Sequence, residues 1–261
     1  MALTFEVVVE GTAGAIAAER TGAHRVELVS ALADGGLTPS LGTVRTTLGA
    51  VSRIDVYPIV RPRGGDFVYD EHEVAAMERD ILAFAEEGVP GVVLGALTPK
   101  GSVDRFVMER LLAAAEGLAV TFHRAFDVTA DPRAALDDLI ALGVDRVLTS
   151  GQEATAAQGS GLLAELVRRA EGRITVMPGG GIRPDNAAGL VIATGATDLH
   201  FSGQATVASA AVHRNPRVRM GAAAVPPEDR RRVTSAEHIV QIMIAARDGA
   251  RQREAVSGGG T

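Results

Sequence analysis

One glycine pattern recurs four times along the chain and restricts what the chain can fold into. Each copy has a glycine, a small apolar residue, two further residues and a hydrophobic run, and the glycines are Gly22, Gly88, Gly143 and Gly195. A glycine in this place favours the left-handed conformation that ends a helix, so the next strand begins almost at once. Successive copies lie 66, 55 and 52 residues apart, about twice the ~30 residues of one strand–helix unit. One more unit fits between neighbouring copies, and the pattern therefore predicts eight strands that alternate with helices.

Parallel strands joined by right-handed helical crossovers can close into a barrel. We therefore expect an α/β fold, a single (β/α)8 TIM barrel at residues 1–250, followed by a disordered tail at 251–261. The length of 261 residues fits the ~250 typical of one such domain. Hydrophobic residues make up 46% and aromatic residues 3%, which suits the aliphatic layers of a barrel interior. An open doubly wound sheet is the alternative, but no glycine-rich dinucleotide-binding turn follows the first strand.

Short apolar runs rich in β-branched residues, bounded by glycine or proline, indicate the strands. They are Thr4–Glu10, Arg25–Ser30, Asp55–Arg61, Gly91–Leu97, Ala119–Arg124, Arg146–Ser150, Thr175–Pro178 and Asp198–Ser202. Helical patterns lie between them. One runs from Glu71 to Glu87. Its apolar side is formed by Val74, Met77, Ile81, Leu82 and Phe84. Another helix begins at Pro132, with Asp131 as its N-cap.

The last part of the chain breaks this regularity. Residues 204–233 contain three prolines and a cluster of arginines, so we expect a long irregular segment after the eighth strand. Connections of this kind tend to be lids, binding loops or interfaces. Arg214, Arg217 and Arg219 then either bring positive charge over the barrel mouth or face a partner subunit. A helix is expected from about Ala236 to Arg247.

Composition excludes several classes of function. The formal net charge of −6 argues against a nucleic-acid-binding surface. The chain has no cysteine, which excludes disulfides and thiolate metal sites. The first residues do not resemble a signal peptide, and no apolar run approaches the ~18 residues that a bilayer requires. We therefore expect a soluble cytoplasmic protein without membrane partners.

Side chains alternate along a strand, so counting from each repeated glycine shows which residues share a face. The fifth position holds Glu27, Val93, Leu148 and His200, and the seventh holds Val29, Gly95, Ser150 and Ser202. Small residues at the seventh position indicate an open mouth at the C-terminal strand ends, where active sites of this fold lie. If this face points inward, Glu27 and His200 share a layer with Glu6 of the strand between them. Arg61 and His123 would approach from across the lumen.

Residues 121–127 lie at the end of the fifth strand and carry three chemically useful groups. His123 can transfer a proton near neutral pH, Arg124 can bind an anion, and Asp127 can orient either side chain. The alternative is structural, because a bond from Asp127 to the histidine or the arginine would tie the loop to the barrel rim.

Residues 61–67 follow the third strand. Arg61 and Arg63 are separated by a proline, so their guanidinium groups lie on one side of an extended segment. The two glycines that follow permit a close approach of the backbone to a carboxylate or phosphate. A rigid turn bridged to Asp66 is the alternative.

Glycine-rich corners follow strands seven and eight. Loops in these two places often bind phosphate through backbone N–H groups in this fold. The residues concerned are Gly179, Gly180, Gly181, Ser202 and Gly203. They could instead only turn a tight corner. Ser150, after strand six, adds a hydroxyl at the same mouth.

These observations give one candidate site. The candidate catalytic residues are Glu27, His123, Arg61, Glu6 and Asp127, with Glu27 or His123 as the acid or base and Arg61 as the anion clamp. The candidate anion-binding residues are Arg63, Arg124, Ser150, Gly179, Gly180, Gly181, Ser202 and Gly203. The weak candidates for a metal are His200, His123 and Glu27, whose nitrogen and oxygen donors suit zinc, manganese or magnesium better than cuprous copper.

Several segments of the chain resemble the CutC family, which is linked to copper homeostasis. They are Arg25–Leu28, Gly35–Gly42, Arg61–Phe67, Thr121–Asp127 and Val147–Gln152. The resemblance extends from about Ala2 to Asn215. It implies a cytoplasmic (β/α)8 barrel that is usually a homo-oligomer, and it implies copper as the metal. Copper binding in the family is ascribed to cysteines, and the positions where we expect them carry Val8, Val9, Val29 and Val68.

Two functions remain open. The resemblance implies a protein of copper homeostasis, although direct copper binding fits poorly with a chain that lacks cysteine. The alternative is an enzyme of the lyase or isomerase kind that acts on a small anionic or phosphorylated metabolite at the C-terminal mouth of the barrel.

Overall fold

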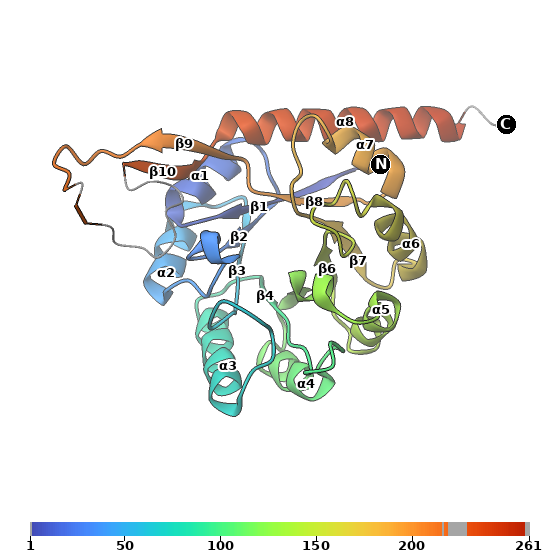
Figure 1. The fold of residues 1–261 in the computed structure, drawn as a ribbon, viewed down its shortest axis with the longest axis horizontal. Coiled ribbons are helices and arrows are strands. Elements are labelled where there is room, and N and C mark those ends of the chain that lie inside the picture. The colour runs from blue at the N-terminus through green and yellow to red at the C-terminus, as the bar shows by residue number, and fades with distance from the viewer. Residues whose placement is uncertain (1, 216, 219–228, 259–261) are drawn as a thin grey trace.

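The computed structural model describes residues 2–215, 217–218 and 229–258. Strands form the centre of the molecule and helices surround them (Figure 1). The central strands are β1 (Thr4–Val9), β2 (Arg25–Leu28), β3 (Asp55–Pro58), β4 (Gly91–Leu94), β5 (Ala119–Phe122), β6 (Arg146–Thr149), β7 (Thr175–Pro178) and β8 (Asp198–Phe201). Each begins at the residue predicted from the sequence.

The strands close into a barrel. Parallel pairing gives the orders β3-β2-β1-β8 and β4-β5-β6-β7. Two parallel bridges join these halves, from Ile59 to Val93 and from Gly179 to His200. The N–H of Val60 also donates to the carbonyl of Val93 over 2.7 Å. The predicted (β/α)8 TIM barrel is therefore confirmed.

A helix follows each barrel strand. The helices are α1 (Thr12–Arg20), α2 (Leu41–Ala50), α3 (Glu71–Glu86), α4 (Arg105–Ala114), α5 (Pro132–Ala141), α6 (Ser160–Ala170), α7 (Ala187–Thr194) and α8 (Ala236–Gly258). The four repeated glycines have φ between 70° and 79°, the left-handed conformation that the pattern required. In α3 the predicted apolar side is confirmed except at Leu82, which is 53% exposed.

The buried apolar residues form two clusters. The larger one fills the space between the strands and the ring of helices. The smaller one packs inside the barrel and consists of Val8, Val29, Tyr57, Ile59 and Val93. The lumen is therefore partly filled by aliphatic layers, as in other barrels of this type, and the polar site lies beside them.

Gly91 makes room for an aromatic ring inside the barrel. A Cβ atom at this position would meet the ring of Tyr57 and would lie 2.5 Å from the backbone oxygen of Ala119. We therefore expect Gly91→Ala to reduce the free energy of unfolding by about 1–3 kcal/mol through overpacking. Gly49→Ala is the matched control, because that helical glycine has no neighbour within 4 Å and should gain about 0.5–1 kcal/mol. Equal urea midpoints for the two variants would contradict the prediction.

The long segment after β8 is present as expected, but it begins and ends in a strand. Residues Gln204–Ala208 form β9, which pairs antiparallel with β10 (Arg230–Thr234), and this hairpin projects beyond the helical ring (Figure 1). Arg214 forms an ion pair with Asp229 over 3.3 Å and does not line the mouth. Arg219, the third arginine expected there, lies outside the described residues.

Helix α8 is longer than expected. It continues from the predicted end at Arg247 to Gly258, so residues 251–258 are helical where we expected a tail, and residues 259–261 lie outside the described part. Gly249 does not break the helix because it serves packing: a Cβ atom there would lie 2.5 Å from the carbonyl oxygen of Ala188 in α7. In the described part of the chain, no helix has the length and apolar character needed to cross a bilayer.

Candidate functional site at the C-terminal mouth of the barrel

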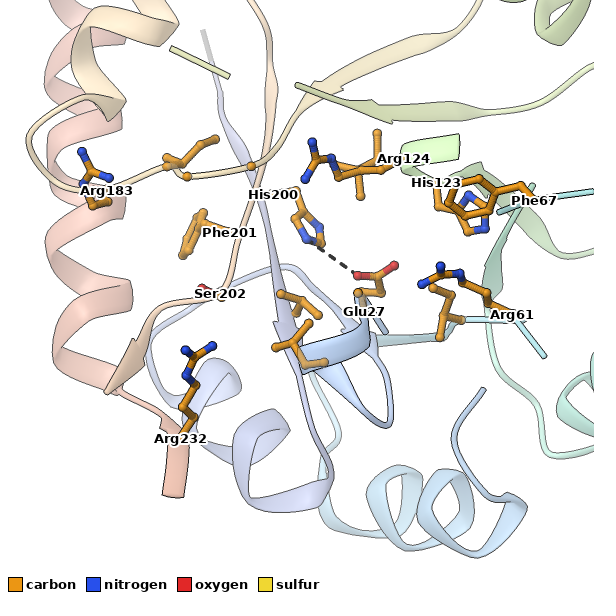
Figure 2. A pocket seen from close by; sticks show the side chains of 18 residues that line it. Glu27, Arg61, Phe67, His123, Arg124, Arg183, His200, Phe201, Ser202 and Arg232 are labelled. Carbon is orange, nitrogen blue, oxygen red and sulfur yellow. Dashed lines mark ion pairs between the residues drawn. The ribbon is translucent and has the colours of Figure 1, made fainter. Parts of the chain in front are cut away.

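A cavity of about 800 Å³ opens where the barrel strands end. Seven ionisable side chains line it together with two aromatic rings (Figure 2). The ionisable residues are Glu27, Arg61, His123, Arg124, Arg183, His200 and Arg232, and the rings are Phe67 and Phe201. Of the polar side chains expected from alternation, Glu27, His200 and Ser202 therefore face a shared space, which is the usual form of a small-molecule site.

Three buried groups from adjacent strands meet at the floor of this cavity. Strand pairing places Glu6 beside His200, and Val8 beside Glu27. The Nδ1 atom of His200 lies 2.7 Å from Oε1 of Glu6, and its Nε2 atom lies 3.7 Å from Oε2 of Glu27. The structure thus brings together the layer of Glu6, Glu27 and His200 predicted from the glycine count. Glu6 is fully buried and does not itself line the cavity.

The environment separates the proton affinities of these groups. Burial alone raises the pKa of Glu6, but its hydrogen bond with His200 and the charge of Arg25 outweigh burial and lower that pKa to about 2. Burial also raises the pKa of Glu27, where the charge of His200 opposes it only in part, and the result is about 7. For His200, burial lowers the pKa, while the hydrogen bond with Glu6 and the charge of Glu27 overcome this and raise it. Glu27 can therefore exchange a proton near neutral pH beside an imidazole whose charged form its neighbours favour.

A layer of charge lies beneath this floor. Arg25 donates to Glu6, and its Nη2 atom lies 3.6 Å from Asp198. Asp198 also lies 3.5 Å from Arg146. We did not predict this layer, although Arg25, Arg146 and Asp198 all occupy the third position after a repeated glycine. The same alternation that indicated Glu27 and His200 could have revealed them.

Arg61 ties two loops together, where we expected an anion clamp. Its Nη1 atom donates to the carbonyls of Asp34 and Gly36 over 2.9 and 3.2 Å, and its Nη2 atom donates to Gly65 over 3.0 Å. The guanidinium carbon lies 4.9 Å from the centre of the Phe67 ring. Arg61 therefore contributes positive charge to the cavity wall while backbone oxygens occupy most of its donors.

Arg124 has a donor to spare. Asp127 accepts from its Nε atom over 2.6 Å and Ser150 accepts from Nη2 over 3.0 Å. Among the described residues, Nη1 has no hydrogen-bond partner, and it lies close to Gly180, where an added Cβ atom would be 3.4 Å away. Asp127 also accepts from Thr149 over 2.5 Å. Asp127 is thus a positioning residue that orients Arg124. This agrees with the alternative given above, in which a bond from Asp127 to the arginine ties the loop to the barrel rim.

The glycine corner after β7 borders the cavity and carries backbone donors. Gly180 and Gly181 line it and have φ of 102° and 68°, a conformation that favours glycine. Within the described residues, no protein acceptor binds the N–H groups of these two glycines. Together with Nη1 of Arg124 they form a corner of the cavity that suits an anion. We call Arg124, Gly180 and Gly181 the anion corner.

Other predicted anion ligands lie away from the cavity. Arg63 binds Glu73 over 2.5 Å and Asp66 over 3.0 Å, and so holds its own loop. The hydroxyl of Ser150 donates to Glu153 over 2.6 Å. Gly179 packs behind His200, and Gly203 packs against Ile239. None of these four candidates lines the cavity, whereas Ser202 does.

Comparison with known proteins identifies the family. The model of the CutC family matches residues 3–205.

The chain belongs to the CutC family.

A family protein CutC of Parabacteroides distasonis is 47% identical over 224 residues, covering 86% of this chain and 92% of that protein. The human copper homeostasis protein cutC homolog is 45% identical over 218 residues, covering 84% of this chain and 80% of the human protein. The crystal structure of a putative copper homeostasis protein CutC from Streptococcus agalactiae superposes with a TM-score of 0.74 at 34% identity, covering 77% of this chain and 98% of that chain.

The described histidine and carboxylate side chains do not gather as the ligands of a metal ion. In the part of the chain that the structure describes, no three histidine, aspartate or glutamate side chains are arranged to hold a metal ion. His123 is buried on a different strand end from Glu27 and His200. Two of the positions where we expected family cysteines, Val8 and Val29, pack in the apolar cluster of the lumen.

Two charged residues that line the cavity, Arg183 and Arg232, were not among the residues predicted from the sequence. Arg183 lies two residues after Gly181, and this closeness to the glycine corner after β7 was the available signal. Arg232 comes from β10 and reaches the mouth through the hairpin (Figure 2). Among the described residues Arg232 has no ion-pair partner, and no local pattern connects it to the barrel.

Proposed function

We propose that this CutC family protein is an enzyme that performs acid–base chemistry on a small anionic metabolite at the C-terminal mouth of its barrel. One observation carries the proposal: Glu27, buried at the floor of a large cavity with its pKa raised to about 7, faces a wall rich in arginine. A carboxyl group with this proton affinity can take up and return a proton at neutral pH.

The charges around the cavity select the kind of substrate. Arg124, Arg183 and Arg232 line it from three different segments of the chain. Asp127 and Asp185 neutralise the first two only in part, through contacts of 2.6 and 3.3 Å. The anion corner adds backbone donors beside Arg124. A carboxylate or phosphate bound there would place the rest of a small molecule over Glu27.

Anion binding can be measured without knowledge of the substrate. We expect saturating inorganic phosphate to raise Tm by about 2–4 °C, because a ligand that binds only the folded state stabilises it. Arg124→Gln should lose most of this increase. Arg105→Gln is the matched control, since Arg105 pairs with Asp138 on the outer helices and should leave the response unchanged. The absence of any response in the wild-type protein would refute the proposal.

The family name supports a second candidate function. Relatives of 42–45% identity are named copper homeostasis protein cutC homolog. We propose on this basis that the chain serves copper homeostasis in the cytoplasm and assembles as a homo-oligomer. Calorimetric titration with cuprous ion under reducing conditions separates a direct from an indirect role. Stoichiometric sub-micromolar binding would favour a direct one.

A further inference from the structure

His123 lines the cavity and carries a buried ring nitrogen without a partner among the described residues. Its Nδ1 atom accepts the N–H of Ala125 over 3.3 Å. Its Nε2 atom is shielded from water and has no hydrogen-bond partner among the described residues. Buried polar atoms are nearly always hydrogen-bonded in folded proteins, so an orphaned one on a cavity wall points to a missing ligand atom.

The ring of His123 is held in one orientation. Gly95 lies against it so closely that an added Cβ atom would be 2.8 Å from Nδ1. On another side, the centre of the Phe67 ring lies 4.9 Å from the centre of the imidazole. Figure 2 shows His123 and Phe67 together on the side of the cavity opposite His200, with Glu27 between the two sides. Such preorganisation is what a substrate-binding donor needs.

The protonation state of His123 is also fixed. Burial, followed by the positive charge of Arg61, lowers the pKa of His123 to about 3. The ring is therefore neutral at physiological pH, and because Nδ1 is the acceptor, the single proton resides on Nε2. His123 cannot serve as the proton-transferring acid or base that the sequence allowed, but it can donate a hydrogen bond.

We propose that Nε2–H of His123 donates a hydrogen bond to a carbonyl oxygen of the substrate, whose neighbouring carbon faces Glu27. This inference rests on the proposed function and names its substrate class: a small carbonyl compound, such as a hydroxy aldehyde or hydroxy ketone, that also carries a phosphate or carboxylate. The anion corner holds the charged group, and His123 holds the carbonyl oxygen.

The corresponding reaction is an enolisation that needs no oxidant or reductant. The carboxylate of Glu27 removes a proton from the carbon next to the carbonyl, and the electron pair of that C–H bond forms a carbon–carbon double bond. The π pair of the carbonyl moves onto its oxygen, where the hydrogen bond from His123 stabilises the negative charge. Glu27, now protonated, returns the proton to the carbon that lost it, and the carbonyl double bond forms again as the negative charge leaves the oxygen. A neutral imidazole suits this role, since it stabilises the charge through its N–H without giving up a proton.

Two probes test the inference. 2-Phosphoglycolate carries a carboxylate next to a phosphate ester and so resembles the enolate, whereas inorganic phosphate fills only the anion corner. We expect 2-phosphoglycolate to raise Tm of the wild-type protein more than inorganic phosphate does. In His123→Phe, the additional rise in Tm with 2-phosphoglycolate (the excess) should disappear, while the rise in Tm with inorganic phosphate remains. His72→Phe, on the exposed side of α3, is the matched control and should keep both responses.

The outcomes separate the two proposals. A His123→Phe protein that keeps the excess would overturn the role of His123 and leave the proposed function standing. A wild-type protein that responds to neither probe would refute the proposed function as well. If His123→Phe does not fold, His123→Leu supplies the test, because leucine also lacks a donor: a folded His123→Leu protein should lose the additional rise in Tm with 2-phosphoglycolate, and one that keeps it would overturn the role of His123.

Nitrogen NMR of the imidazole rings distinguishes ligand binding by His123 from a purely structural role, because only a hydrogen bond to a ligand would shift the Nε2 resonance. Between about pH 5 and 8 the His123 ring should stay neutral with its proton on Nε2. The Nε2 proton resonance should shift with 2-phosphoglycolate and stay in place with inorganic phosphate. A charged ring, or an equal shift with both probes, would contradict the inference.

Discussion

Replacement of Arg25 with Met should reduce the free energy of unfolding by about 3–5 kcal/mol at neutral pH, because it leaves buried carboxylates without their partner. The side chain of Arg25 is 5% exposed. It donates to Glu6, lies 3.6 Å from Asp198 and covers the ring of Tyr57 at 5.2 Å. Met retains most of the volume and removes the charge. Urea denaturation measures the loss.

The loss should depend on pH in a defined direction. Folded Glu6 holds its proton more weakly than the unfolded chain does, since its pKa is about 2 against an ordinary 4.5. Its stabilising effect is therefore present above about pH 4.5 and disappears as the pH falls toward 2. Arg25 is one cause of that low pKa. The difference in the free energy of unfolding between the wild-type protein and Arg25→Met should therefore be largest near pH 7 and decrease toward about pH 3.

An exposed arginine provides the comparison. Arg169 pairs with Asp137 over 2.5 Å between α6 and α5, and both side chains are more than 40% exposed. Ion pairs in water contribute about 0–1 kcal/mol, so Arg169→Met should change the urea midpoint little at any pH. Equal losses for Arg25→Met and Arg169→Met would mean that the charged layer inside the barrel does not stabilise the fold.

The barrel was predictable because its signals are local. Each repeated glycine ends a helix through its own φ, and the spacing between copies is a property of the chain. The ends of the strands were predicted less exactly than their beginnings. Residues 25–30 were expected as one strand, but β2 ends at Leu28, and Ser30 forms an antiparallel bridge with Leu37. The exposure of Leu82 has a similar cause, because adjacent residues such as Ile81 and Leu82 are ~100° apart on a helix and cannot share one narrow face.

The end of the chain depends on contacts that no local pattern reports. Residues 204–208 and 230–234 form strands only because they pair with each other, and strand preference depends on such partners. Gly249 would ordinarily weaken a helix, yet here it permits the close approach of α8 to Ala188 of α7. At residues 204–208, 230–234 and 251–258, tertiary packing therefore outweighs the sequence signals that suggested irregular structure.

In the candidate site, alternation along the strands placed the right groups in one layer but could not assign their partners. Glu6, Glu27 and His200 meet because their strands are neighbours. By contrast, the donors of Arg61 are taken by carbonyls from the loop after β2, which lies about 25 residues earlier in the chain. Backbone atoms distant in the sequence decide which atoms a long side chain binds. The sequence alone therefore could not show that Arg61 ties two loops together or that Asp127 orients Arg124.

The second large effect concerns Glu27, and here a substitution should stabilise the protein. Burial is the main reason why the pKa of Glu27 is raised from 4.5 to about 7. The folded protein therefore binds this proton more tightly than the unfolded chain, and stability falls as the pH rises from about 4.5 to 7. At about 1.36 kcal/mol for each pKa unit, the charged side chain costs the folded state about 3 kcal/mol above pH 7.

Glu27→Gln removes this ionisation while keeping the shape of the side chain. We expect the variant to unfold at a higher urea concentration than the wild-type protein at pH 8, by about 2–3 kcal/mol, and to match it near pH 4.5. Glu165→Gln serves as the control, because Glu165 pairs with Arg133 at the surface and should show no comparable pH-dependent gain. A Glu27→Gln variant less stable than the wild-type protein at pH 8 would contradict the raised pKa.

The same substitution bears on function. A buried carboxyl group that lowers the free energy of unfolding at neutral pH is expected where that group has a catalytic role. Active sites retain such groups although they reduce the stability of the fold. Glu27→Gln should therefore gain stability and lose the ability to exchange a proton with a bound carbonyl compound, which deuterium uptake from heavy water measures. Gain of stability without loss of exchange would leave Glu27 as a buried group of the barrel core and move the acid–base role elsewhere in the cavity.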